Sequence, residues 1–378
     1  MREVIYFSSV DINTYSTWLE VDLNAIKHNV AEVIKMTGRE VMAVIKANGY
    51  GHGMRPIAQA CVAGGATWCG VARIEEALAL RRAGISSRIL VLGFTPASKI
   101  PDAIEHNITV ALFNSELTQT YLDYVRIHGG VLRAHVKVET GMGRLGMPID
   151  VVPPFLRALK NSPILVEGIF THFARADEPD SDSTPEQIRK FEALLAELTP
   201  QGLKPFYVHA ANSAAVLNFP ASYYDLTRPG DLLLGMNPMT DRELPPQFRP
   251  ALTWKARLIS VRTFPPGHGI SYGSKYVTSK EERIGVIPIG YGDGFRRVDG
   301  QQVLVGGKRV NIVGRVCMDQ CMLQLDDVPE AKVGDEIVLV GRQGQEFISI
   351  DEVAKRWGTI NYEVVCGLAE RLPRIYIE

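Results

Sequence analysis

Hydrophobic and polar positions follow two different patterns along this chain of 378 residues. From residue 18 to about residue 235, short apolar runs rich in β-branched side chains alternate with longer stretches whose apolar side chains recur at helical spacing. In the first of these stretches, Asn24 is suited to the N-cap of a helix and Gly38 to the position after its end. This part of the chain therefore predicts alternating strands and helices.

Eight apolar runs in this part predict β-strands. They cover residues 41–45, 67–72, 89–94, 109–113, 132–138, 165–170, 206–210 and 224–228. Helical stretches separate them at residues 54–63, 75–83, 98–105, 116–128, 151–161, 185–198 and 212–217. Strict alternation of eight strands with helices favours an α/β fold of the (β/α)8 TIM-like barrel type, and an open doubly wound sheet is the alternative.

The pattern changes after Pro245, Pro246 and Pro250, which indicate a joint between domains. Beyond them, polar and apolar positions alternate with a period of two, as expected for strands that are buried on one face. These runs, and one expected helix at the end, cover residues 254–261, 283–289, 310–316, 336–340 and 351–357. We therefore predict a barrel domain with an N-terminal extension, residues 1–243, and a mainly β C-terminal domain, residues 244–378.

The composition is that of a soluble globular protein, with 46% hydrophobic residues, 22% charged residues and a formal net charge of -1. This balance predicts neither a nucleic acid nor a membrane as partner. The first 17 residues make a poor signal peptide and the five cysteines are scattered, so we expect a cytoplasmic protein. Cys317 and Cys321 are spaced as zinc ligands can be, but no second ligand pair follows. Core packing is favoured for them, and no metal site is predicted.

The most distinctive stretch is residues 44–53, VIKANGYGHG, in which an apolar run delivers Lys46 to a glycine-rich turn. Three glycines allow the backbone to turn sharply after a buried strand. A lysine at such a strand end is partly desolvated, which lowers its pKa and makes it a candidate nucleophile or Schiff-base former. Taken alone, the stretch is equally compatible with a lysine that reaches out to solvent.

Unusual polar residues recur where the predicted strands end. In a (β/α)8 barrel the chemistry collects at the C-terminal ends of the strands. Five of the eight strand ends carry charged or histidine side chains, namely Lys46, the segment from Lys137 to Arg144, His172, His209 and Arg228. So many polar strand ends on one barrel mouth predict a catalytic site there.

The last two strand ends suggest the ligand. The frequent phosphate site of this fold lies after strands seven and eight, beside a helix N-terminus. Ser213 offers a hydroxyl at a helix start, and Gly230 allows close approach of the backbone. A phosphate site together with a desolvated lysine suggests pyridoxal 5'-phosphate (PLP) held as a Schiff base. The competing interpretation is a barrel aldolase that binds a sugar phosphate.

Seven motifs, in order along the chain, resemble those of alanine racemases. The stretch 44–53 resembles the PLP-lysine motif of that family, and the match continues through TGMGRLG (140–146), THFA (171–174), HAANSAA (209–215), SYG (271–273), CMDQCM (317–322) and INYEV (360–364). The resemblance covers about residues 18–375 and both predicted domains. It implies a PLP-binding barrel followed by a β domain.

The resemblance also implies roles for individual residues. Lys46 would carry the cofactor and act as the base on one face of the substrate, and Tyr272 of the partner subunit would act on the other face. His172 would support the tyrosine, because a phenol is a poor base unless cationic neighbours stabilise its anion. Arg228 would face the pyridine nitrogen, with His209 behind it. An arginine there would keep this nitrogen unprotonated and suppress side reactions such as transamination.

Further positions match the binding residues of the family. Those at the phosphate site are Tyr50, Ser213, Gly230, Asp231 and Tyr362, and those around the substrate are Arg144, Met318 and Asp319. Lys137 matches a lysine that is carbamylated in some members. The chain departs from the family pattern at Gly49, where alanine is common, and at residues 367–371, where a more polar stretch is expected.

The sequence thus predicts a homodimeric, PLP-dependent alanine racemase with shared active sites, which interconverts L- and D-alanine and supplies D-alanine for bacterial peptidoglycan. A serine or broad-specificity racemase is the nearest alternative, because one hydroxyl in a small pocket is weakly rejected. A non-catalytic PLP-binding barrel is a second alternative, which the presence of Tyr272 disfavours. A basic amino-acid decarboxylase of the same fold is a third, which Arg228 disfavours.

Overall fold

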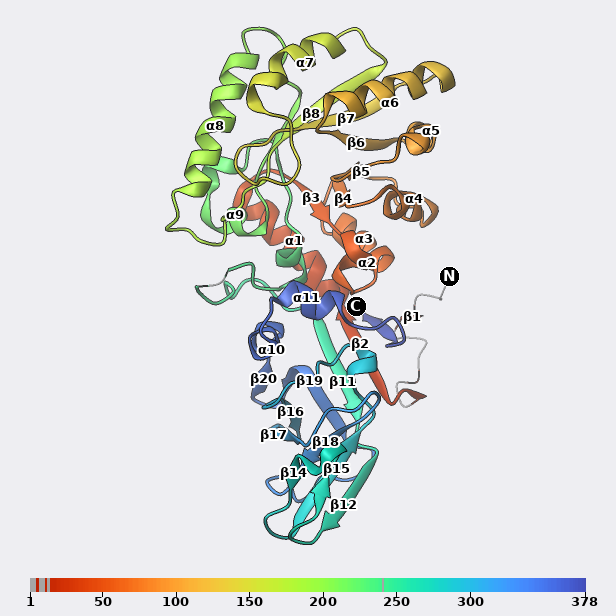
Figure 1. The fold of residues 1–378 in the computed structure, drawn as a ribbon, viewed down its shortest axis with the longest axis vertical. Coiled ribbons are helices and arrows are strands. Elements are labelled where there is room, and N and C mark those ends of the chain that lie inside the picture. Colours follow the sequence, from red (N-terminus) through yellow and green to blue (C-terminus); the bar gives the residue numbers. More distant parts are fainter. Residues whose placement is uncertain (1–4, 7–10, 12–13, 240) are drawn as a thin grey trace. The chain divides into compact units, whose positions relative to one another are not determined.

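The computed structural model describes residues 5–6, 11, 14–239 and 241–378. These residues form two compact units, which Figure 1 shows as a ribbon. Residues 25–49 and 54–249 form the first, here called the barrel unit. The second, the β unit, combines the described residues up to residue 24 with residues 50–53 and 250–378. The chain therefore leaves the barrel unit and returns to it within a few residues of Lys46.

Eight parallel strands form the sheet of the barrel unit, in the order β10-β3-β4-β5-β6-β7-β8-β9. They are β3 (Glu40–Val44), β4 (Trp68–Val71), β5 (Arg88–Val91), β6 (Ile108–Leu112), β7 (Leu132–Lys137), β8 (Ile164–Phe170), β9 (Tyr207–His209) and β10 (Leu226–Thr227). The two end strands approach each other, because the Asp225 N–H donates to the Val208 carbonyl at 3.0 Å. The barrel is thus nearly closed, which confirms the predicted (β/α)8 fold and excludes the open sheet.

Helices alternate with the strands of the barrel unit along the chain, as the pattern predicted, and α1 precedes the first of these strands. They are α1 (Leu23–Thr37), α3 (Met54–Ala63), α4 (Ile74–Arg82), α5 (Ile100–Glu105), α6 (Ser115–His128), α7 (Val152–Leu159), α8 (Ser183–Leu198) and α9 (Ser213–Asn218). Gly38 follows α1 with a left-handed φ of 62°, as expected for its C′ position. The N-cap prediction was wrong, because α1 begins at Leu23 directly after a strand and Asn24 lies inside its first turn.

The interior of the barrel is filled by side chains from its strands. Seven strands contribute one residue each to a single buried cluster, namely Met42, Trp68, Leu90, Ala111, Phe170, Tyr207 and Leu226. The remaining strand, β7, contributes His135, which is completely buried and lies 5.2 Å from Trp68 between ring centroids. A polar side chain therefore lies within an otherwise apolar core.

The β unit contains an eleven-stranded sheet and a two-stranded ribbon. The order is β1-β21-β2-β11-β19-β16-β17-β18-β15-β12, with β20 paired to β19. Its strands are β1 (Ile5–Tyr6), β2 (Thr17–Asp22), β11 (Leu252–Arg257), β12 (Ser260–Phe264), β15 (Glu282–Ile287), β16 (Gln302–Val305), β17 (Lys308–Val313), β18 (Cys321–Gln324), β19 (Glu336–Gln343), β20 (Glu346–Ile348) and β21 (Arg374–Ile377). The ribbon pairs β13 (Gly269–Ile270) with β14 (Tyr276–Val277), and the short helices α10 (Ile350–Trp357) and α11 (Asn361–Cys366) also belong to this unit. The short helix α2 (Lys46–Tyr50) belongs to the barrel unit up to Gly49.

The N-terminal strand β2 belongs to the sheet of the β unit. It pairs in antiparallel fashion with β11 and in parallel fashion with β21. The sequence pattern predicts it as an N-terminal extension of the barrel domain, because alternation along a strand identifies a strand without identifying its sheet. The predicted run 254–261 is likewise two strands, since β11 ends at Arg257 and β12 begins at Ser260.

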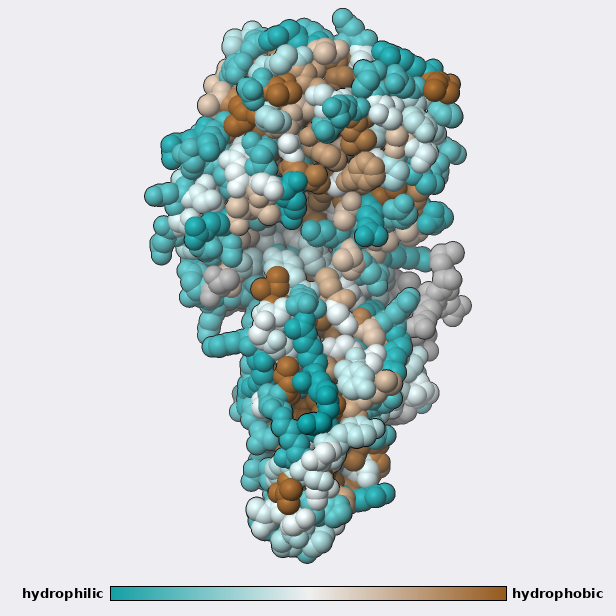
Figure 2. Space-filling model, viewed as in Figure 1, coloured by the Kyte–Doolittle hydropathy of each residue, from teal (hydrophilic) through white to brown (hydrophobic). Residues whose placement is uncertain are grey.

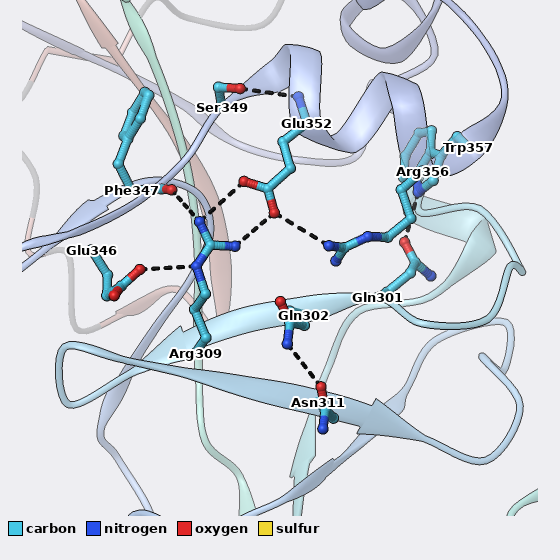
Figure 3. Close-up of polar contacts among 10 residues, drawn as sticks. All are labelled: Gln301, Gln302, Arg309, Asn311, Glu346, Phe347, Ser349, Glu352, Arg356 and Trp357. Atoms are coloured by element: carbon cyan, nitrogen blue, oxygen red, sulfur yellow. Dashed lines mark hydrogen bonds and ion pairs between the residues drawn. The ribbon is translucent and has the colours of Figure 1, made fainter.

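A half-buried arginine joins α10 to the sheet of the β unit (Figure 3). Arg309 on β17 donates from Nε to Glu346 at 2.9 Å and from Nη1 to Glu352 at 2.6 Å. Its Nη2 donates to the carbonyl of Phe347 at 2.7 Å. Ser349 caps α10 by accepting the Glu352 N–H at 3.0 Å. One guanidinium thus joins a sheet strand, a hairpin and the first turn of a helix.

The described residues lack the features of membrane-spanning helices and of metal-binding clusters. No helix among the described residues is long and apolar enough to cross a membrane. Within the same residues, no three His, Cys, Asp or Glu side chains are grouped as metal ligands would be. Cys321 is buried, whereas Cys317 is half-buried. On the face drawn in Figure 2, hydrophobic residues are scattered among many hydrophilic ones.

Candidate active site

Lys46 lies directly after the buried strand β3 and is half-buried. The backbone that follows is left-handed at Ala47, Asn48 and Gly49, with φ of 52°, 55° and 63°. A left-handed position costs a residue other than glycine roughly 1–2 kcal/mol. A Cβ on Gly49 would lie 3.2 Å from Ile57, so glycine relieves strain where the family often has alanine. Strained backbone of this kind collects at functional sites.

Two side chains hold the strained turn in place. Glu76 accepts the Ala47 N–H at 2.7 Å with one carboxylate oxygen and the Ala72 N–H at 2.8 Å with the other. Asn48 accepts the N–H of Met54 at 2.9 Å, which joins the turn to the start of α3. Charge-assisted hydrogen bonds of this type offset part of the backbone strain. Sequence reasoning had missed Glu76, since nothing in its helical context marks it.

The glycines after the turn are required by close approach within the β unit. A Cβ on Gly51 would lie 2.0 Å from the carbonyl oxygen of Val365, and one on Gly53 would lie 1.9 Å from the hydroxyl of Tyr376. Arg374 donates from Nε to the Gly51 carbonyl at 2.6 Å. The glycine-rich motif therefore combines a left-handed turn with close backbone packing.

Arg228 is buried at the end of β10, with 4% of its surface exposed. Its Nη1 lies 3.0 Å from Nδ1 of His209. Its Nη2 donates to the carbonyls of Thr171 and Ala210 at 2.7 and 2.9 Å and lies 3.3 Å from Nδ1 of His172. Because a guanidinium can only donate, both imidazole nitrogens that face it must accept. The guanidinium is therefore held rigidly in one plane.

The mouth of the barrel is strongly positive. Arg228 makes no ion pair with a carboxylate in the part of the chain that the structure describes, and burial lowers its pKa to about 9. Burial and the neighbouring charges of Arg228, Arg144, Lys137 and Lys46 hold the pKa of His172 well below its usual range. Four cations converging on a neutral histidine make a site suited to an anionic ligand.

Lys137 ends β7 and is 6% exposed. Burial, followed by repulsion from Arg144, lowers the pKa of Lys137 to about 8. The next polar residue, Glu139, accepts the N–H groups of residues 141, 142 and 143 at 2.5, 2.6 and 2.9 Å. It thereby shapes the loop that leads to Arg144. The amine of Lys137 is thus neutral in a substantial fraction of molecules near pH 8.

The region after β9 and β10 is built from Ser213, Gly230 and Asp231, all of which are buried. Asn212 caps α9 by accepting the Ala215 N–H at 3.0 Å. The hydroxyl of Ser213 accepts the Gly230 N–H at 2.9 Å. Because the oxygen accepts this bond, its own proton remains available to a ligand. A hydroxyl donor beside a helix N-terminus suits a phosphate group.

The buried histidines of the barrel should make the protein sensitive to acid. Burial and cationic neighbours lower the pKa values of His135, His172 and His209, and that of His135 reaches about 3. Between pH 7.5 and pH 5.5 the unfolded chain therefore binds protons that the folded chain does not, so stability falls as the pH falls. We expect a loss of roughly 4 kcal/mol in unfolding free energy over this range, measured by urea denaturation. Equal stability at both pH values would contradict the neutral state of these rings.

Tyr272 and Met318 are exposed residues of the β unit, at 68% and 54%. The backbone before the tyrosine is fixed, because Ser271 has a φ of 67° and donates from its hydroxyl to the carbonyl of Arg315 at 2.6 Å. Tyr272 also borders an open hollow of about 450 Å³. A large aromatic side chain presented on a rigid turn and left in solvent is suited to a partner or ligand.

Asp319 is oriented by an arginine from the C-terminal segment. Arg371 donates from Nη2 to Asp319 at 2.8 Å and from Nε to the buried Asp293 at 2.7 Å. These bonds raise the pKa of the Arg371 guanidinium above its usual value. In the same unit, the rings of Tyr50 and Tyr362 lie 5.9 Å apart between centroids. Asp319 and the pair Tyr50 and Tyr362 thus have defined partners within the β unit.

Comparison with known proteins decides the family. Residues 21–238 match the model of the alanine racemase N-terminal domain, and residues 251–376 match that of the alanine racemase C-terminal domain. The chain belongs to the alanine racemase family. Membership makes it a racemase, an isomerase with the barrel and β-domain architecture described above.

Similar alanine racemases cover nearly the whole chain. That of Symbiobacterium thermophilum is 44% identical over 364 residues, which are 95% of this chain and 97% of the relative. Alanine racemase 1 of Bacillus subtilis is 41% identical over 369 residues, 96% of this chain and 93% of the relative.

Solved structures agree with this family. The alanine racemase from E. faecalis superposes with a TM-score of 0.91 at 38% identity, over 99% of this chain and 100% of that one. The alanine racemase from Bacillus anthracis with bound L-Ala-P gives a TM-score of 0.89 at 39% identity, over 96% and 95% of the two chains.

The residues that the racemase motifs singled out fall into two groups. The barrel unit holds Lys46, Lys137, Arg144, His172, His209, Ser213, Arg228, Gly230 and Asp231. The β unit holds Tyr50, Tyr272, Met318, Asp319 and Tyr362. Direct contacts join His172, His209 and Arg228 in the first group. Ser213 and Gly230 form a second contact there.

Sequence reasoning missed several residues that position this site. Gln187 is buried on the apolar face of α8, where it donates to Thr140 and to the His172 carbonyl, both at 3.0 Å. It also accepts the Ala174 N–H at 2.9 Å and so fixes the loop on both sides of His172. A polar residue at a position that helical spacing assigns to the core was the available signal.

Proposed function

We propose that this chain is a PLP-dependent alanine racemase that interconverts L- and D-alanine by a two-base mechanism. Lys46 acts on one face of the substrate, and Tyr272 of the partner subunit acts on the other. The observation that carries the proposal is the buried Arg228, held by His209 and two carbonyls at the barrel mouth that also holds Lys46. The racemases that share its architecture support it.

The residues of the barrel unit fit PLP. The Ser213 hydroxyl and the first N–H groups of α9 suit its phosphate, with Gly230 and Asp231 beside them. Tyr50 and Tyr362 are proposed to complete the phosphate site. When bound to Lys46, PLP supplies an electron-withdrawing ring that stabilises negative charge at the α-carbon of the substrate. The half-buried position of Lys46 at a rigid turn suits such an attachment.

Arg228 sets the electronic character of the proposed site. A guanidinium presents only donors, so Arg228 would hold a cofactor nitrogen placed beside it unprotonated. The cofactor would then supply weaker electron withdrawal, which would favour racemisation over transamination. A decarboxylase benefits from an acidic partner at this place. The arginine therefore favours racemisation over the decarboxylase alternative.

Tyr272 is proposed to act in the site of a partner subunit within a homodimer. In a single chain its side chain is 68% exposed on a fixed turn, which leaves it available to a second copy. His172 would then stabilise the ionised phenol, supported from behind by Arg228. A non-catalytic PLP-binding barrel would need neither this tyrosine nor the Arg371 clamp on Asp319.

Alanine is the substrate that the comparisons favour. The racemase of Bacillus anthracis carries bound L-Ala-P, and Arg144, Met318 and Asp319 are the residues proposed to bind the carboxylate and line the pocket here. Serine is the alternative, because a small pocket discriminates one hydroxyl by roughly 10²-fold at most. The test is the turnover of L-alanine and L-serine by purified protein loaded with PLP. Faster racemisation of serine than of alanine would overturn the alanine assignment. Release of carbon dioxide from lysine would favour the decarboxylase alternative.

Lys137 is proposed to carry a carbamate. A carbamate forms when a neutral amine attacks carbon dioxide: an N–C bond forms, one C–O π bond breaks and the amine releases a proton to solvent. The pKa of Lys137 near 8 leaves much of this amine neutral. The resulting anion would orient Arg144, whose positive charge already influences Lys137. Mass spectrometry of the intact protein under carbon dioxide should show one added carboxyl group, which Lys137→Ala should remove.

The proposed cellular role is to supply D-alanine for bacterial peptidoglycan from the cytoplasm. All the relatives named above are bacterial alanine racemases, which supports this role. The expected partners are the small-molecule substrate and a second copy of the chain, with neither nucleic acid nor membrane.

Replacing Tyr272 by phenylalanine should separate the two faces of the reaction. If Lys46 serves D-alanine, Tyr272→Phe should still exchange the α-hydrogen of D-alanine with solvent deuterium, but racemisation should fall by about 10²–10⁴-fold. Mass spectrometry and NMR of the recovered alanine measure both events. Equal loss of exchange for the two enantiomers would show that Tyr272 does not act on one face.

A further inference from the structure

A line of buried polar side chains runs from Arg228 into the interior of the barrel. Nη1 of Arg228 lies 3.0 Å from Nδ1 of His209, and Nε2 of His209 lies 2.8 Å from Nδ1 of His135. Nε2 of His135 then faces the carboxylate of Glu167 at 3.9 Å, an electrostatic contact rather than a hydrogen bond. Both rings are completely buried. Four side chains from four strands or strand ends thus form a continuous series.

The hydrogen bonds of this series can have only one direction, in which each side chain donates to the next one from Arg228 towards Glu167. Arg228 has no acceptor atom, so Nδ1 of His209 accepts and the proton of this ring lies on Nε2. That proton is donated to Nδ1 of His135, whose own proton must then lie on Nε2. There it points towards the carboxylate of Glu167. Burial together with the charges of Arg228 and Arg88 lowers the pKa of His135 to about 3, so the ring stays neutral.

The backbone around these residues is adapted to them. Along β7 and β8, Ala134 pairs with Val166 and His135 with Gly168, which leaves Glu167 as the extra residue of a β-bulge. Bulges redirect a side chain. A Cβ on Gly168 would lie 2.5 Å from Nδ1 of His135, so glycine is needed to make room for the ring.

Other contacts fix both ends of the inner pair. Thr109 donates to one oxygen of Glu167 at 2.9 Å and Arg133 donates to the other at 2.8 Å. The ring of His135 lies 5.2 Å from Trp68 and 6.1 Å from Tyr207 between centroids. The charged and titratable groups beside members of this series are Arg88 and Tyr207 at His135, Lys137 and His172 at Arg228, and Arg133 at Glu167.

We propose that His135 and Glu167 are positioning residues that act through His209 to hold the Arg228 guanidinium in its working orientation. Without an acceptor at position 135, the Nε2 proton of His209 loses its buried partner. His209 can then rotate or move its proton to Nδ1, and Nη1 of Arg228 is released. The importance of that release for catalysis rests on the proposed function, whereas the proton positions do not depend on it.

Two substitutions of His135 separate the series from simple packing. His135→Phe keeps an aromatic ring against Trp68 but removes the acceptor and the donor. His135→Gln loses the ring, yet its amide offers one acceptor and one donor as neutral imidazole does. We expect His135→Phe to lower kcat for alanine about ten-fold with KM changed less than about two-fold, and His135→Gln to recover most of the loss. A packing role predicts the opposite order, so a more active phenylalanine variant would overturn the proposal.

Removing the charge of Glu167 tests the inner end. Glu167→Gln should lower kcat about ten-fold at unchanged KM. The matched control is Glu178→Gln, an exposed carboxylate paired with Arg175, which should retain wild-type kcat. Wild-type kcat in Glu167→Gln would overturn the role of Glu167.

A measurement that needs no activity tests the proton positions. In protein labelled with 15N-histidine, His135 and His209 should both carry their proton on Nε2 between about pH 6 and pH 8. In His135→Phe, the His209 signals should change from this pattern. A proton on Nδ1 of either ring in the wild-type protein would overturn the series, even if racemisation is confirmed. If the wild-type protein shows the expected proton positions but does not racemise alanine, the result would count against the proposed function and not against the series.

Discussion

Subunits of Lys46→Ala mixed with subunits of Tyr272→Phe are expected to regain about a quarter of wild-type racemase activity, although each variant alone is inactive. In an isologous dimer, each site takes its lysine from one subunit and its tyrosine from the other. A heterodimer of the two variants therefore has one site with both defects and one intact site. Random exchange makes about half of the dimers heterodimeric. Since each heterodimer has one intact site of two, about a quarter of all sites are intact.

The measurement requires proof that subunits exchange. Two affinity tags purified in sequence isolate the heterodimer, whose activity should then be about half that of the wild type. Mixing two batches of Lys46→Ala gives the control and should remain inactive. Activity at background in the purified heterodimer would show that Tyr272 acts within its own chain.

Replacing Arg228 by glutamate is expected to slow racemisation and to increase the share of alanine that is converted to pyruvate. A carboxylate at this position would hold a proton on a facing ring nitrogen, and it would lose the bonds to the carbonyls of Thr171 and Ala210. Racemisation should fall by about 10²–10³-fold, the usual cost of removing a preorganised electrostatic group. Conversion of alanine to pyruvate should rise relative to racemisation.

Arg228→Lys is the matched control for this substitution. It keeps a positive charge but replaces a planar fork by a single point donor, so one of the contacts to His209 and the carbonyls is lost. We expect a loss of about ten-fold in racemisation without added pyruvate. Chiral chromatography measures the alanine enantiomers, and a coupled lactate dehydrogenase assay measures pyruvate. Equal pyruvate formation by both variants would show that charge at position 228 does not control the side reaction.

The barrel could be predicted from the sequence because its strands are short, buried and separated by amphipathic helices. The strand that ends before Lys46 and the helix from Met54 to Ala63 were predicted within a residue of their observed bounds. The motifs drew attention to Lys46 and Tyr272 because each lies in a stretch of distinctive composition, and the pattern of polar strand ends did the same for Arg228. Local properties of the chain thus account for most of the barrel and for these three residues of the candidate site.

What the sequence did not predict depends on contacts between distant segments. His135 and Glu167 lie inside apolar runs, where a single polar residue does not change the prediction of a buried strand. Their proximity follows from a bulge between β7 and β8. Arg371 meets Asp319 only through tertiary folding. The left-handed φ of Ala47 was equally hidden, since alanine gives no local reason to adopt it.

The placement of β2 limits how this protein can be dissected. In the sheet order of the β unit, β2 lies between β21 and β11, and it comes from the opposite end of the chain from β21. A fragment that starts at residue 250 would therefore leave two strands with bare edges, each a template for aggregation. Because β2 runs parallel to β21, a permuted fragment that appends residues 14–24 after residue 378 needs a flexible crossover linker of about a dozen residues, and with that linker it would restore the missing strand. In ultracentrifugation, that permuted fragment should sediment as a discrete species, whereas the simple fragment should form heterogeneous aggregates.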